Sequence, residues 1–193
     1  MNFIRIWLTG IIRPWNVFDA LRRKPAPGWG FRAVVLRFGI TSITTILALH
    51  LLEYRPSVPS YLNLLSAENY YLAEIFFLPL LGIAGWLLSG ALVHLLIRAT
   101  RTLGDIDYVL NVIGFALLIP MPVAWLIDWI SIGLGCWQEG LIPVLHSLIS
   151  LWEICLIAIG LNRIRRVNQW FALLLGFIVK AFVFIPLAML FIR

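Results

Sequence analysis

The chain has 193 residues, of which 62% are hydrophobic and 12% are charged, and its formal net charge is +6. A soluble domain has about 45–50% apolar and about 25% charged residues, so a soluble fold of this composition would expose apolar patches that aggregate. The composition therefore excludes a soluble protein and predicts an all-α integral membrane protein. The positive charge, which in a soluble protein would indicate nucleic acid, is explained better by membrane topology, and no nucleic acid partner is expected.

The N-terminal segment, residues 1–31, is basic and amphipathic, and it predicts one or two short helices before the first span. Pro14 suits the first turn of the second short helix. A helix with arginine outside and tryptophan inside is typical of the membrane interface, whereas a cytosolic helix packed on the bundle would show a similar pattern. The sequence leaves both interpretations open. The apolar side chains that fall close to one helical face are Trp7, Ile11, Trp15, Phe18 and Leu21.

Residues 32–193 contain five apolar segments, each close to the roughly 20 residues that a transmembrane helix needs. The third segment contains Pro120 and Pro122, which predict a kink. The fold class is therefore a bundle of five transmembrane helices. The predicted spans are about 33–52, 71–97, 109–130, 141–161 and 171–192.

The distribution of lysine and arginine predicts the orientation, because cytoplasmic loops carry an excess of both. With the N-terminus in the cytoplasm and the C-terminus outside, twelve of the 15 basic residues lie on the cytoplasmic side, and Arg37, near the start of the first span, is one of them. Arg55 and Arg193 lie outside, and Lys180 lies within a span. A basic cytoplasmic face attracts anionic lipid headgroups, so the lipid bilayer is an expected partner.

The stretch HLLIRATRTLGDIDYVLN, residues 94–111, is the most polar part of the apolar region and predicts a cytoplasmic turn between the second and third spans. Asp105 suits the N-cap or the first turn of the third span. Its neighbour Asp107 adds only one more carboxylate, which makes a poor metal site. Together with the basic loop after the fourth span, this turn gives the candidate cytoplasmic-face residues Arg98, Arg101, Asp105, Asp107, Arg163, Arg165 and Arg166.

Ionisable residues inside the spans are candidates for function. Glu153 and Lys180 lie roughly 12–14 Å from the cytoplasmic ends of the fourth and fifth spans, and adjacent antiparallel helices would pair them. The structural interpretation is an ion pair that fixes helix register. The functional interpretation is a polar cluster on a proton or cation path, formed by Glu153 and Lys180 with His94, His146 and Ser150.

Three acidic residues are expected near the outer membrane boundary, where water reaches them: Asp128, Glu53 and Glu74. The sequence has no HExxH, GxSxG or P-loop motif and no Cys/His spacing typical of a metal site. No enzyme activity, cofactor or metal is therefore expected.

Three stretches resemble the Ypt-interacting-protein (Yip) family of five-span membrane proteins, in its prokaryotic branch: RPWNVFDALRRKPAPGWGF (13–31), GWLLSGALVHLLIRATRTLGDIDYVLNVIGFALLIPMP (85–122) and LWEICLIAIGLNRI (151–164). The resemblance implies five spans, a cytosolic N-terminus, an external C-terminus and the cytoplasmic membrane of a prokaryote. Eukaryotic members act in vesicle traffic and contact Rab-type GTPases. The Asp-Leu-Tyr-Gly-Pro motif and the long cytosolic region of those members are missing here, which weakens the expectation of GTPase binding.

The leading interpretation is a non-enzymatic membrane-organising or adaptor protein that engages an unknown membrane protein partner, with homo-oligomerisation as a further option. The alternative is a small channel or transporter for protons, ions or small solutes that uses Glu153, Lys180 and His94. A dry interior around Glu153 would favour the adaptor, and a continuous polar cavity would favour the transporter.

Overall fold

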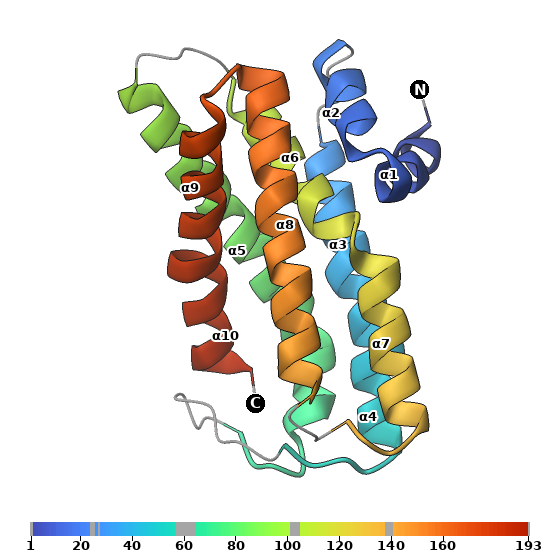
Figure 1. The fold of residues 1–193 in the computed structure, drawn as a ribbon. Coiled ribbons are helices and arrows are strands. Elements are labelled where there is room, and N and C mark those ends of the chain that lie inside the picture. The colour runs from blue at the N-terminus through green and yellow to red at the C-terminus, as the bar shows by residue number, and fades with distance from the viewer. Residues whose placement is uncertain are drawn as a thin grey trace.

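The computed structural model describes residues 2–23, 26, 28–56, 65–100, 105–137 and 141–192, and these residues form a helical bundle without strands (Figure 1). The five predicted spans are confirmed, with ends shifted by at most four residues. The helices that are long and apolar enough to cross a membrane are Trp29–Leu51, Tyr70–Ala99, Ile106–Gly133, Ile142–Ile164 and Gln169–Phe191. The protein is therefore an integral membrane protein.

The first, third and fifth spans are each built from more than one helical segment. The first and fifth contain a π-helical turn, η1 and η2, and the third is broken between α6 and α7. In chain order the elements are α1 (Phe3–Ile12), α2 (Pro14–Arg23), α3 (Trp29–Thr41), η1 (Ser42–Ile46), α4 (Leu47–Leu51), α5 (Tyr70–Ala99), α6 (Ile106–Leu118), α7 (Met121–Gly133), α8 (Leu141–Arg165), α9 (Gln169–Val179), η2 (Lys180–Phe184) and α10 (Ile185–Phe191).

The break in the third span confirms the kink that its prolines predicted. In a continuous helix the N–H of residue 122 would donate to the carbonyl of Leu118, but Pro122 has no N–H. The indole N–H of Trp7 donates to this carbonyl instead, at 3.0 Å. Helix α1 is thereby fastened to the bundle at the point where the third span bends.

The two N-terminal helices pack on the bundle through the face that the sequence singled out. Phe18 is 0% exposed and Leu21 is 1% exposed, while Trp7 and Ile11 are half-buried. Trp15 is 47% exposed and is the exception. The interpretation of this whole face as the one turned to lipid is therefore wrong, because most of it covers the core of the bundle.

A different apolar face of α1 is uncovered. Ile4, Leu8 and Ile12 follow at intervals of four residues, which places them on one face of the helix, and they are 57%, 52% and 79% exposed. This face, the α1 stripe, has the spacing and the exposure that suit contact with lipid.

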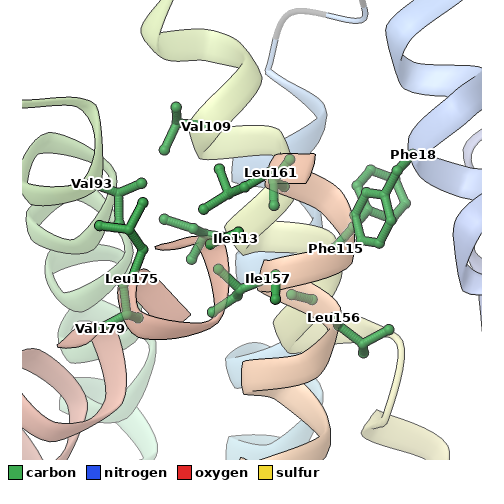
Figure 2. Packing of buried hydrophobic residues seen from close by; sticks show 14 of the residues in the cluster. Phe18, Val93, Val109, Ile113, Phe115, Leu156, Ile157, Leu161, Leu175 and Val179 are labelled. Carbon is green, nitrogen blue, oxygen red and sulfur yellow. The ribbon is translucent and has the colours of Figure 1, made fainter. Parts of the chain in front are cut away.

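The end of the bundle that carries the N-terminus has a close-packed apolar core around α6. Val112, Ile113 and Phe115 of α6 and Leu156 and Ile157 of α8 are all 0% exposed. In Figure 2, Ile113 and Ile157 lie toward Val93 of α5 and Leu175 of α9, whereas Phe115 lies beside Phe18 of α2. We call this cluster the apolar core.

Helices α3 and α6 approach closely where glycine faces glycine. A Cβ added to Gly114 would lie 2.5 Å from the carbonyl oxygen of Gly30. Next to this contact, the Gly30 N–H donates to Asn111 Oδ1 at 2.6 Å, and Asn111 Nδ2 donates to the Ala26 carbonyl at 3.2 Å. The first N–H groups of a helix have no partner within the helix, so Asn111 satisfies one of them and locks the start of the first span to the third.

Candidate functional site

The predicted ion pair between the fourth and fifth spans is present. Lys180, the first residue of η2, donates a hydrogen bond to Glu153 Oε2 on α8, and the two side chains are only 10% and 3% exposed. The ammonium also lies 4.9 Å from the ring centroid of Phe184, in cation–π contact. Each charge thus has its counter-charge within the bundle, as a buried ion pair requires.

A second buried polar group forms around Asp128 of α7. His146 Nε2 lies 2.8 Å from Asp128 Oδ1, and the Thr45 hydroxyl donates to Asp128 Oδ2 at 3.3 Å. The expectation that Asp128 is an interface residue is wrong, because this carboxylate is buried, with 2% residue exposure. Helix α7 turns Asp128 toward α8 and η1, where these two side chains replace water as its partners.

Arg37 is the third charged group inside the bundle, and its expected place on the cytoplasmic side is also wrong. It lies eight residues into α3, roughly 12 Å along the helix axis. Its Nη1 donates to the Thr41 hydroxyl at 3.1 Å, and the same oxygen accepts a 3.1 Å bond from the Trp125 indole. Among the described residues, the buried Nε of Arg37 has no hydrogen-bond partner.

These groups border a cavity of about 200 Å³. Its polar wall comes from three spans and consists of Arg37, His146, Ser150, Glu153 and Lys180. The rest of the wall is apolar and includes Leu78, Leu81, Leu117, Ile149, Leu187 and Ile192.

The lining residues place the cavity in one half of the bundle. It runs from Lys180, in the middle of the fifth span, to Ile192, the last described residue after α10. On the other side lie Leu156, Ile157 and Val179 of the apolar core, all 0% exposed (Figure 2). The arrangement is therefore a pocket on the C-terminal side of the bundle rather than a passage through it.

Four of the five residues predicted to form the intramembrane polar cluster are brought together: Glu153, Lys180, His146 and Ser150 all line this cavity. His94 does not. It lies on α5 twelve residues beyond Gly82, a residue of the cavity wall, which is roughly 18 Å along the helix. The inclusion of His94 in the cluster is therefore wrong, because the residue lies beside the apolar core, near the C-terminal end of α5.

The other two acidic residues expected at the outer boundary, Glu53 and Glu74, differ in exposure. Glu53 is exposed, as expected. Glu74 is 2% exposed and hydrogen-bonds with Tyr70, whose hydroxyl donates to the Phe191 carbonyl at 2.9 Å. The expectation for Glu74 is wrong because tyrosine, rather than water, partners this carboxyl group.

Both π-helical turns occur beside the polar groups. Thr45 belongs to η1 and Lys180 begins η2, and π-helical turns are frequent at functional sites. The run TSITT at 41–45 is the feature of the sequence that could have indicated the irregular turn η1. Serine and threonine hydroxyls that bond to a carbonyl four residues earlier bend helices. Thr41, Ser42 and Thr44 all make such bonds, at 2.7–2.9 Å.

The predicted cytoplasmic-face residues are placed in part. Asp105 is the N-cap of α6, and its side chain accepts the Asp107 N–H at 3.2 Å, which confirms the capping prediction. Arg98, Arg163 and Arg166 are exposed, and Arg163 pairs with Asp19 of α2 at 3.5 Å. Arg101 and the side chain of Arg165 lie outside the described residues.

Comparison of the chain with protein-family models, with curated proteins and with solved structures finds no match. Within the described ranges, no group of three or more His, Cys, Asp or Glu side chains is placed to hold a metal ion.

Proposed function

We propose that this chain is a non-enzymatic integral membrane protein of the Yip type that acts as a membrane-organising or adaptor protein. The observation that supports this function is a group of exposed arginines on α1, α2, the start of α3 and the ends of α5 and α8, which meet at one end of the bundle (Figure 1). We call it the basic end. Its exposed residues are Arg5, Arg13, Arg22, Arg23, Arg32, Arg98, Arg163 and Arg166.

The basic end faces the cytoplasm in this proposal, with the C-terminus outside. At the opposite end the described residues include Arg55, which pairs with Glu68 at 3.6 Å. Each lysine or arginine near an anionic membrane surface contributes about 1 kcal/mol of attraction, so the basic end binds acidic headgroups and acidic segments of a partner. The membrane in question is the cytoplasmic membrane of a prokaryote, as the Yip resemblance implies.

The packing of the basic end supports an adaptor over a channel. The apolar core fills this half, with Leu156, Ile157 and Leu161 of α8 at 0% exposure. Water and ions need a continuous polar path, and among the described residues the polar wall of the cavity ends at Glu153 and Lys180, where the apolar core begins. The intramembrane charges then act as structural pairs between spans.

The test is photo-crosslinking in the native membrane, with a photoreactive amino acid at position 98 on the basic end and a matched control at position 53, which is exposed at the opposite end. A discrete adduct with a protein or an acidic lipid at position 98, absent at position 53, is the expected result. Equal labelling at both positions, or no specific adduct at position 98, would overturn the adaptor function. A protease added to intact cells reports the orientation, since it should cleave a C-terminal tag and spare an N-terminal one.

The cavity favours a second candidate, a small transporter for protons, ions or solutes. Transport would require Glu153 and Lys180 to separate, so that the cavity opens toward the cytoplasm. Flux of protons and cations into liposomes tests this candidate. Flux above that of empty liposomes, which Glu153→Gln abolishes, would favour transport, and flux no greater than in empty liposomes would leave the adaptor.

A further inference from the structure

The strongest chemical anomaly in the bundle is the guanidinium of Arg37 on the wall of the cavity. Its Nε is buried and has no hydrogen-bond partner in the described part of the chain, and the Thr41 hydroxyl that accepts from Nη1 is neutral. An arginine has five N–H donors in a fixed fork. A buried N–H group of a charged side chain without a hydrogen-bond partner is costly, so this site is incomplete as the protein alone forms it.

The acidic groups near Arg37 are already engaged. Glu153 and Asp128 act on the guanidinium electrostatically, but Glu153 bonds Lys180, and Asp128 bonds His146 and Thr45. Of the charged side chains on the cavity wall, Arg37 and Lys180 are cationic and Glu153 is anionic. The wall itself therefore has one positive charge more than its own carboxylate balances, and Asp128, which lies outside the wall, acts on Arg37 without a hydrogen bond to it.

The rest of the cavity determines what else the occupant must have. Leucine and isoleucine from α5, α6, α8 and α10 form most of its remaining wall, together with Phe38 and Phe184, and these side chains offer no hydrogen bonds. An apolar cavity of about 150 Å³ holds benzene, so the 200 Å³ here suits an apolar body of about six to eight carbon atoms. A two-chain phospholipid is far too large.

We propose that this cavity is a binding site for a small amphipathic monocarboxylate, an aromatic or short-chain carboxylic acid whose carboxylate is held by Arg37. The planar guanidinium matches a carboxylate with two parallel N–H···O bonds. The apolar body lies along Leu78, Leu117 and Leu187. The ligand enters from the C-terminal end of the bundle, because the apolar core closes the other end. This site is independent of the adaptor function proposed above.

The test uses the full-length protein in phosphatidylcholine nanodiscs, with 4-fluorobenzoate as the probe and its ¹⁹F resonance as the readout. Binding should broaden or shift the resonance. Hexanoate should compete, whereas hexanol, which lacks the carboxylate, and formate, which lacks the apolar body, should compete at least about tenfold more weakly. Arg37→Gln should weaken binding at least about tenfold, since a hydrogen bond to a charged group contributes about that much. Arg32→Gln removes an exposed arginine of the same helix and should leave binding unchanged.

A second variant protects the test against misfolding of Arg37→Gln. Leu187→Trp fills the cavity without touching a charged group, and it should also abolish binding. Absence of probe binding to the wild type would show that the cavity holds water only and would overturn the proposal. Equal binding by Arg37→Gln and Arg32→Gln would overturn the role of Arg37, and competition by formate as strong as by hexanoate would overturn the amphipathic ligand.

Discussion

The two halves of the bundle are held together by different means. The half at the basic end has the apolar core and the glycine contact between α3 and α6. The half at the C-terminal end, from mid-bundle outward, contains seven of the nine buried polar or charged residues of the described chain; only Ser89 and Asn111 lie in the other half. Lipid tails are as apolar as leucine, so burial alone does not drive helices together in a membrane. Close packing therefore holds the helices together at the basic end, and polar pairs hold them together at the C-terminal end.

The largest effect that separates the two halves should come from breaking the buried ion pair. Lys180→Met leaves the Glu153 carboxylate buried without a counter-charge, and we expect a loss of about 3–5 kcal/mol in the free energy of unfolding. Unfolding in mixed detergent micelles of increasing denaturing fraction measures this loss.

The double variant Glu153→Met with Lys180→Met is the control for that measurement. An apolar pair of similar size often matches a buried ion pair in stability, so the double variant should recover most of the loss. If it stays as unstable as Lys180→Met while the two helices remain packed, the charges are not interacting as a pair.

A smaller effect should follow from disturbing the close packing of the other half. Gly30→Ala would place a Cβ 2.5 Å from the Leu110 carbonyl oxygen, and forcing helices apart in a packed core costs about 1–3 kcal/mol. Gly39→Ala, on the same helix, meets no atom within 4 Å and should be neutral or stabilising by up to about 1 kcal/mol. The same unfolding assay compares them, and equal effects would show that the α3–α6 contact is not tight.

The smallest effect on stability is expected at the α1 stripe. Leu8→Ser changes an exposed side chain, so the free energy of unfolding should move by no more than about 0.5 kcal/mol. An environment-sensitive fluorophore at position 12 should nevertheless report a more aqueous surrounding, because the stripe has lost part of its lipid contact. Thr9→Ser is the matched control. An unchanged emission in Leu8→Ser would place the stripe away from the membrane.

The fold could be predicted because the bilayer dictates it. A span needs a run of apolar residues, and residues 33–52 or 171–192 could be recognised by length alone. The Glu153–Lys180 pair could be predicted as well, since two opposite charges at one depth on adjacent helices have few other partners. The N-cap of α6 could be predicted because Asp105 is an aspartate directly before an apolar run, and aspartate is a preferred N-cap residue.

The rest of the polar site depends on helix rotation, which hydropathy does not encode. Arg37 and Asp128 were assigned to the membrane boundaries because each lies toward the end of an apolar run. Which face they turn inward depends on how α3 and α7 are rotated in the bundle, and α7 begins only after the break at Pro120. The prediction for His94 is wrong for a different reason, its depth in the bundle. This residue is ionisable and lies within a span, but it is on α5 too far from the cavity to join it.

The bond between Asn111 and the Gly30 amide has a consequence for the order in which the protein is made. The two residues are 81 positions apart in the chain. At about 5–20 residues per second of synthesis, Gly30 leaves the ribosome roughly 4–16 s before its partner. The first span therefore enters the bilayer with the start of its helix still bonded to interfacial water. It reaches its final register only when the third span has been inserted, so the third span completes the packing of the first.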